Sequence, residues 1–208
     1  MRTQIQPVAD FRSIAVYVVL HGQTEDNVAG RWTGCNDSPL TQIGREQARK
    51  SGRILKKIGG DLSRLDFVAS PLHRACTTME LLREEAGLPP LAYRTDHRLM
   101  ENHCGDWTSL TPEEIRLLDA EHLERRNGDE WNWAAPGGQS AAAQYEIVCA
   151  FLNTLRRDSV IVTHGLTSRL IRARLLELSP SSAMVHEFFA RATVARFSAG
   201  EHIFDTEV

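Results

Sequence analysis

The stretch Ile14-Ala-Val-Tyr-Val-Val-Leu20 is an uninterrupted apolar run rich in β-branched residues, and it ends at His21-Gly22. Such a run is typical of a strand buried on both faces of a parallel sheet. A second stretch rich in β-branched residues, Ser159-Val-Ile-Val-Thr163, ends at His164-Gly165. The two runs predict neighbouring strands that each deliver a histidine to the same edge of one sheet.

The segments around these runs predict helices that alternate with strands. Thr41 can cap a helix that Gly59-Gly60 ends, and a short strand is expected at Leu65 to Ala69. Ser70-Pro71 is expected to begin a helix that runs to about Ala86. Further helices are expected over 113–125, around 145–155 and from 165 through 178, and further strands at 185–189 and 193–197. This order predicts one α/β domain over residues 1–208 with a mostly parallel sheet, in which residues 102–138 form a cap or insertion.

Composition excludes several classes of protein. The 208 residues are 42% hydrophobic and 25% charged, which excludes disordered and collagen-like chains. The net charge of −3 gives no basic field, so no nucleic-acid partner is expected. The longest apolar run is far shorter than the roughly 18 residues of a membrane span, and Met1 to Ser13 has no signal core. A cytoplasmic protein without a membrane partner is expected.

The cysteines and histidines do not predict a metal site. The four cysteines have no CxxC pair and are interpreted as reduced thiols. No histidine group has the spacing of metal ligands.

Basic side chains are expected at the carboxyl ends of the buried strands. His21 and His164 follow two of these strands, and Arg74 follows the strand that ends before Ser70-Pro71. Ligands of open α/β sheets bind at this edge, and helix N-termini near Arg74 and His164 favour an anion. Because a guanidinium donates to phosphate oxygens in a planar fork, phosphate is the natural occupant.

Six ordered blocks over residues 14–175 resemble the histidine phosphatase superfamily, also called the phosphoglycerate mutase-like family. They are Leu20-His-Gly-Gln-Thr-Glu-Asp-Asn27, Gly34 to Thr41 with Gly44 and Gln47-Ala48, Ser70 to Thr77, Leu99-Met-Glu101 with Gly105-Asp-Trp107, Pro136 to Ser140, and Val162-Thr-His-Gly165. The resemblance implies a three-layer α/β/α fold with a small helical cap.

The resemblance also implies a reaction and a set of roles. His21 would be the nucleophile that forms a phosphohistidine, and Glu101 would act as general acid and then as general base. Arg74 and His164 would hold the phosphoryl oxygens. Further substrate-binding candidates are Gly22, Thr24, Asn27, Arg31 and Gly165. Neither a cofactor nor a metal is implied, because positioning and charge stabilisation suffice for phosphoryl transfer.

One position departs from the family pattern, because Leu20 stands where the family has an arginine before the nucleophile. The leading hypothesis is a phosphomonoesterase that hydrolyses a small phosphorylated metabolite, with Arg31 in place of the missing guanidinium. A phosphoglycerate-type mutase is the alternative enzyme, although the stretch from Glu101 to His164 is short for a mutase. A third hypothesis, favoured by Leu20, is a weakly active or inactive member that binds an anionic ligand or a protein partner. The C-terminal apolar runs are a candidate edge for a homodimer.

Overall fold

The central element is a six-stranded sheet in the order β3-β2-β4-β1-β5-β6. The computed structural model describes residues 13–185 and 190–198 and the backbone of 201–206. The strands are β1 (Val16–Leu20), β2 (Asp66–Ala69), β3 (Arg94–Thr95), β4 (Ser159–Thr163), β5 (Thr193–Ser198) and β6 (Glu201–Thr206). The first four are mutually parallel where they pair, whereas β5 runs antiparallel to β1 and to β6. The prediction of a mostly parallel sheet is confirmed.

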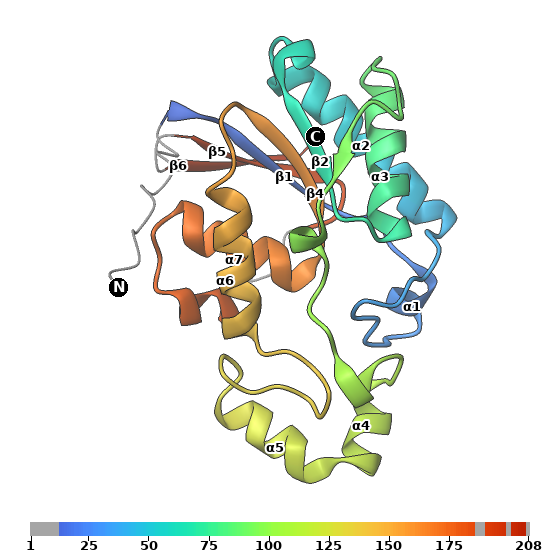
Figure 1. The fold of residues 1–208 in the computed structure, drawn as a ribbon. Coiled ribbons are helices and arrows are strands. Elements are labelled where there is room, and N and C mark those ends of the chain that lie inside the picture. Colours follow the sequence, from blue (N-terminus) through green and yellow to red (C-terminus); the bar gives the residue numbers. More distant parts are fainter. Residues whose placement is uncertain (1–12, 186–189, 199–200, 207–208) are drawn as a thin grey trace.

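Helices cover both faces of this sheet and complete three layers (Figure 1). Helices α2 (Gln42–Ile58) and α3 (His73–Glu85) lie on one face, and α6 (Ala141–Leu152) and α7 (Gly165–Leu175) lie on the other. The remaining helices are α1 (Glu25–Val28), α4 (Pro112–Leu118) and α5 (Ala120–Gly128), with short 3₁₀ turns at Leu62–Arg64, His97–Leu99, Gly105–Trp107 and Pro180–Met184. The predicted three-layer α/β/α fold is confirmed.

Strand β1 contributes to two separate hydrophobic cores. Val16, Val18 and Leu20 pack into the core beneath α6 and α7, while Tyr17 and Val19 pack into the core beneath α2 and α3. Alternate residues of a strand point to opposite faces, so a strand between two helical layers must be apolar at every position. This is the physical reason for the continuous run in the sequence.

Four predicted helices have wrong boundaries, and one of them, the helix expected around 145–155, begins at Ala141 and ends at Leu152 as α6. Helix α3 begins at His73 rather than after Ser70, and its N-cap Leu72 makes no side-chain cap bond. The single helix expected over 113–125 is two helices that meet at Asp119. The Asp119 carboxylate accepts a hydrogen bond from Trp107 Nε1 at 2.8 Å, so this residue ties the break to the loop before it. Helix α7 ends at Leu175, before the predicted end at 178.

The C-terminal predictions have mixed outcomes. The strand expected at 193–197 is confirmed as β5, and β6 was not predicted. Val185 ends a 3₁₀ turn, and the rest of the strand expected at 185–189 lies outside the described residues.

Helices α4 and α5 lie apart from the sheet, below it in Figure 1. They have a small core of their own, in which Trp107, Ile115 and Ala135 are buried. The Trp107 ring packs between Trp32 and Trp133, with ring centroids at 5.5 Å and 4.4 Å. Trp32 and Trp133 in turn border a cavity, so this helical segment forms a wall opposite the sheet. Within the described part of the chain, no helix is long and apolar enough to cross a membrane.

Candidate active site

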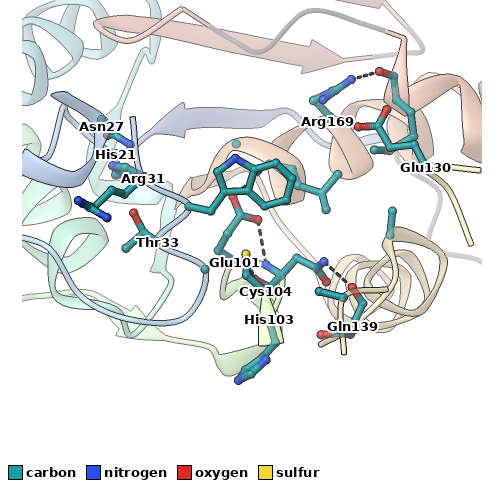
Figure 2. Close-up of a pocket in the computed structure, with 18 of the residues that line it drawn as sticks. His21, Asn27, Arg31, Thr33, Glu101, His103, Cys104, Glu130, Gln139 and Arg169 are labelled. Atoms are coloured by element: carbon teal, nitrogen blue, oxygen red, sulfur yellow. Dashed lines mark hydrogen bonds between the residues drawn. The ribbon is translucent and has the colours of Figure 1, made fainter. Parts of the chain in front are cut away.

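A cavity of about 530 Å³ opens at the carboxyl end of β1. Its walls come from the end of β1, the loops at 31–34 and 101–104, the end of α5, the start of α7 and Arg191. Figure 2 shows His21 and Asn27 together on one side of this cavity, with Glu101 near its centre. The position agrees with the general rule that open α/β sheets bind ligands outside the carboxyl ends of their strands.

His21 is buried at the end of β1 with only 6% of its surface exposed. Its Nδ1 lies 2.7 Å from the carbonyl oxygen of Gly22. Because a carbonyl can only accept, Nδ1 carries the ring proton and Nε2 keeps its lone pair. Burial, followed by the positive charge of Arg74, lowers the pKa of His21 to about 3. The ring is therefore a neutral imidazole with a free nucleophilic nitrogen at physiological pH.

Arg74 is held from the first turn of α3 and is 2% exposed. Its Nη1 donates to the Asn36 carbonyl oxygen at 2.5 Å, and its Nη2 donates to the Gly34 carbonyl oxygen at 2.7 Å. The Asp37 carboxylate lies 3.4 Å from Nη1. Its Nε is buried and has no partner among the described residues. The loop over residues 34–37 thus fixes the guanidinium of Arg74 and leaves its Nε without a protein partner among the described residues.

His164 is the N-cap of α7 and is fully buried. Its ring centroid lies 5.2 Å from that of His21, because the β1 and β4 register pairs Leu20 with Thr163. The Ser70 hydroxyl accepts the Leu72 N–H and lies 2.7 Å from His164 Nε2, so it can donate to this nitrogen. When Ser70 donates, the ring proton of His164 is on Nδ1, and this nitrogen has no partner in the described structure. Burial, then the charge of Arg74, holds the His164 pKa well below its ordinary value.

The Glu101 carboxylate lies over the N-terminus of α7. One oxygen accepts the Asn102 N–H at 3.0 Å (Figure 2). The other accepts the Leu166 N–H at 3.2 Å. Burial raises the pKa of Glu101, while these backbone donors and the charge of Arg74 oppose the rise. A raised pKa is the property that a carboxyl general acid needs near neutral pH.

The remaining site candidates divide into two groups. Asn27, Arg31 and Gly165 line the cavity with His21, Arg74 and Glu101. Gly22 and Thr24 do not line it and have supporting positions instead. The Gly22 N–H donates to Thr78 Oγ1, and Thr24 Oγ1 caps α1 by accepting the Asn27 N–H.

Three arginines in the cavity wall were missed by sequence reasoning: Arg126, Arg169 and Arg191. Arg126 stacks on Trp32 with its guanidinium carbon 5.0 Å from the ring centroid. None of the three belongs to one of the quoted sequence blocks, so only the fold could place them here. No cluster of three or more potential metal ligands occurs among the described residues.

Comparison with known proteins identifies the family. Residues 16–204 match the family described as the histidine phosphatase superfamily (branch 1). A glucosyl-3-phosphoglycerate phosphatase of Mycobacterium tuberculosis is 33% identical over 80% of this chain and 77% of its own length. A 2,3-bisphosphoglycerate-dependent phosphoglycerate mutase of Afipia carboxidovorans is 33% identical over 82% of this chain and 84% of its own length. The crystal structure of an alpha-ribazole phosphatase from Shigella flexneri, 25% identical, superposes with a TM-score of 0.77 over 88% of this chain and 89% of that one. The chain therefore belongs to the histidine phosphatase superfamily.

Proposed function

We propose that this protein hydrolyses phosphate monoesters of small metabolites through a phosphohistidine on His21. The observation that carries the proposal is the placement of His21, whose Nδ1 contacts the Gly22 carbonyl oxygen and whose Nε2 is left for attack, beside the unpartnered Nε of Arg74 and the buried ring of His164, 5.2 Å away between centroids. Buried donors without a partner are costly unless a ligand satisfies them, and a phosphoryl group offers several acceptor oxygens. The names of the phosphatase relatives support the same activity.

In the first step, His21 Nε2 attacks phosphorus and the bond from phosphorus to the ester oxygen breaks. The leaving oxygen takes a proton from Glu101, whose raised pKa favours the protonated form before the reaction. Arg74 and His164 donate to the non-bridging oxygens and stabilise the charge that develops on them. The products of this step are the free alcohol and phosphohistidine.

In the second step, water attacks the phosphohistidine. The Glu101 carboxylate accepts a proton from this water, the bond from phosphorus to Nε2 breaks, and orthophosphate leaves. His21 returns to its neutral form, with its Nδ1 proton held throughout by the Gly22 carbonyl. The cycle needs no group beyond these side chains, substrate and water.

The test is phosphate release from p-nitrophenyl phosphate and a panel of metabolite phosphomonoesters, with the His21→Ala variant as control. We expect turnover by the wild type only, and a mass increase of one phosphoryl group on His21 after rapid acid-free quenching. Absence of both turnover and labelling would refute the proposal and favour a member that binds an anionic ligand without reaction.

A phosphoglycerate-type mutase is the second candidate, because a relative of that name matches 82% of this chain. A mutase must return the phosphoryl group to a second hydroxyl before water intercepts it. The distinguishing measurement is the fate of 3-phosphoglycerate with and without a bisphosphate primer. Primer-dependent isomerisation faster than phosphate release would establish the mutase, whereas release alone supports hydrolysis.

A further inference from the structure

The end of β1 presents no cation to the phosphoryl site. Leu20 lines the cavity, is 5% exposed, and packs with Val18 in the core beneath α6 and α7. The family resemblance puts an arginine at this position, where it would meet the phosphoryl oxygens directly. In this chain, a second guanidinium beside Arg74 at the phosphoryl site must come from another position or be missing.

Arg31 is not free to supply this guanidinium. Its Nη1 donates to the Ser109 carbonyl oxygen at 2.7 Å and pairs with the Glu114 carboxylate at 2.9 Å. Glu114 also accepts the Thr111 N–H in the capping box of α4. Arg31 thus joins the first loop to the helical cap, and moving it toward His21 would break both contacts.

Arg191 reaches the cavity by a different route. The antiparallel register pairs Val16 with Phe197 and Val18 with Ala195, so the start of β5 lies at the carboxyl end of β1. Arg191 precedes β5 by two residues and lines the cavity. The topology therefore delivers this side chain to the same edge of the sheet as His21.

The contacts of Arg191 leave part of its guanidinium available. Its Nη2 donates to Asn27 Oδ1 at 2.9 Å, and Asn27 Oδ1 is fixed in turn by the Thr24 N–H. Its Nε is buried without a partner among the described residues, as is Nε of Arg74. Its charge also contributes to the low pKa of His21, after burial and Arg74, which places it within electrostatic range of that ring.

The backbone next to Arg191 is strained. Ala192 has a φ of +61°, in the left-handed region that alanine rarely adopts. Non-glycine residues in this region cost free energy and cluster where a site needs a side chain in a set direction. Here the strained residue joins Arg191 to the first residue of β5, so the strain sits at the point where the chain turns into the cavity.

We propose that Arg191 supplies the phosphoryl-binding guanidinium that Leu20 lacks, with Asn27 positioning it. This assignment rests on the proposed function, because it names a binding residue for the same phosphoryl group. Two separated positions of the chain can thus serve one role: position 20 at the end of β1 and position 191 before β5. The role requires a guanidinium beside His21, and the sheet register allows either position to provide it.

The first experiment measures the affinity for vanadate, a phosphate-like oxyanion, by calorimetry, together with kcat/KM for p-nitrophenyl phosphate. Arg191→Ala is expected to weaken vanadate binding by about tenfold to hundredfold, the usual effect of losing a charge-assisted hydrogen bond. Arg191→Lys keeps the positive charge and loses the two-pronged geometry of the guanidinium. Its vanadate affinity is expected to lie between those of the wild type and Arg191→Ala. Arg116→Ala removes an exposed arginine of α4 and is the control. A vanadate affinity of Arg191→Ala within twofold of wild type would overturn the proposal.

The second experiment asks whether positions 20 and 191 share the role. Leu20→Arg in the Arg191→Ala background is expected to recover at least tenfold in vanadate affinity. The same substitution in the wild type is expected to give no gain, because two guanidinium groups would then compete beside His21. An equal gain in both backgrounds would show that Arg191 has a separate role. Thermal unfolding of each variant checks that it is folded, and Arg191→Met replaces Arg191→Ala if the latter unfolds.

The two measurements separate this proposal from the proposed function. A wild type that binds vanadate through Arg191 and hydrolyses no phosphomonoester would refute the reaction and retain the binding residue. A wild type that forms phosphohistidine, with unchanged binding and turnover in Arg191→Ala, would retain the reaction and refute the binding residue.

Discussion

Substitution of Gly44 by alanine tests how His21, the proposed nucleophile, is positioned. Gly44 lies in the first turn of α2, and its ideal Cβ would lie 2.0 Å from the carbonyl oxygen of Gln23. In the reverse direction, a Cβ on Gly22 would lie 2.1 Å from the carbonyl oxygen of Gly44. Helix α2 therefore packs backbone to backbone against the two residues that follow His21. No side chain intervenes that could move aside.

The magnitude follows from this geometry. Ordinary van der Waals contact begins at 3.4 Å, so α2 and the segment after His21 must separate by roughly 1.4 Å. Overpacking of this kind costs about 1–3 kcal/mol of stability. For a chain of this size we expect the Tm to fall by roughly 2–12 °C. If His21 is the nucleophile as proposed, a displacement of about 1 Å at this residue is also expected to lower kcat by on the order of a hundredfold.

The matched control is Gly128→Ala at the end of α5, where a Cβ would have no neighbour within 4 Å. We expect this variant to be as stable as wild type or more stable by up to about 1 kcal/mol, with unchanged kcat. Tm comes from thermal unfolding followed by circular dichroism, and kcat from p-nitrophenyl phosphate hydrolysis. A Gly44→Ala protein with wild-type Tm and kcat would refute the reasoning. A lowered Tm with wild-type kcat would show that α2 yields and the catalytic segment does not.

Two further predictions concern proton transfer and pH. Glu101→Gln is expected to lower kcat by about 10²–10⁴-fold for alkyl phosphates and far less for p-nitrophenyl phosphate, whose leaving group needs little protonation; equal losses for both substrates would contradict the general-acid role. The pKa of His21 is about 3 in the folded protein, against an ordinary value of 6.5. As the pH falls, the unfolded chain therefore binds a proton on His21 before the folded protein does. The free energy of unfolding is therefore not reduced by His21 above about pH 6.5. It falls progressively as the pH drops from about 6.5 to 3, and at pH 5 the loss is about 2 kcal/mol. Unfolding by denaturant at pH 7 and pH 5 should show a smaller loss for His21→Asn than for wild type or for His97→Asn, a control at an exposed histidine; an undiminished loss in His21→Asn would contradict the assignment.

The strands and their histidines could be predicted from the sequence because their signal is local. A strand covered on both faces is largely apolar, so β1 and the centre of β4, Val160 to Val162, are visible as runs, and polar side chains follow each of them. The helix boundaries were less predictable because tertiary partners decide them. Ser70 looks like a helix cap, yet its hydroxyl contacts His164, 94 residues away in the sequence. Asp119 ends one helix and begins the next while it accepts a bond from Trp107.

The site could be predicted only as far as its residues follow strands or occur in family blocks. Arg191 does neither: it precedes an antiparallel strand, and its neighbours are apolar. Only the pairing of β5 with β1 brings it to the cavity, and pairing between residues far apart in the sequence has no local signal. The missed arginines therefore share one cause, which is that their positions depend on packing between elements.

The presence of Leu20, where the family pattern has an arginine, has a structural consequence that favours the Arg191 assignment. An arginine at the end of β1 would interrupt the apolar face of Val16, Val18 and Leu20 beneath α6 and α7. In this chain that face is continuous, and Leu20 is buried with it. Arg191 instead lies in a turn before β5. Its side chain reaches the cavity without replacing an apolar residue of the core beneath α6 and α7. If Arg191 binds the phosphoryl group as proposed, the chain keeps both a continuous core and a cation beside His21. The absence of arginine before the nucleophile would then not indicate loss of activity, and the cation would have to be sought at the start of the antiparallel strand.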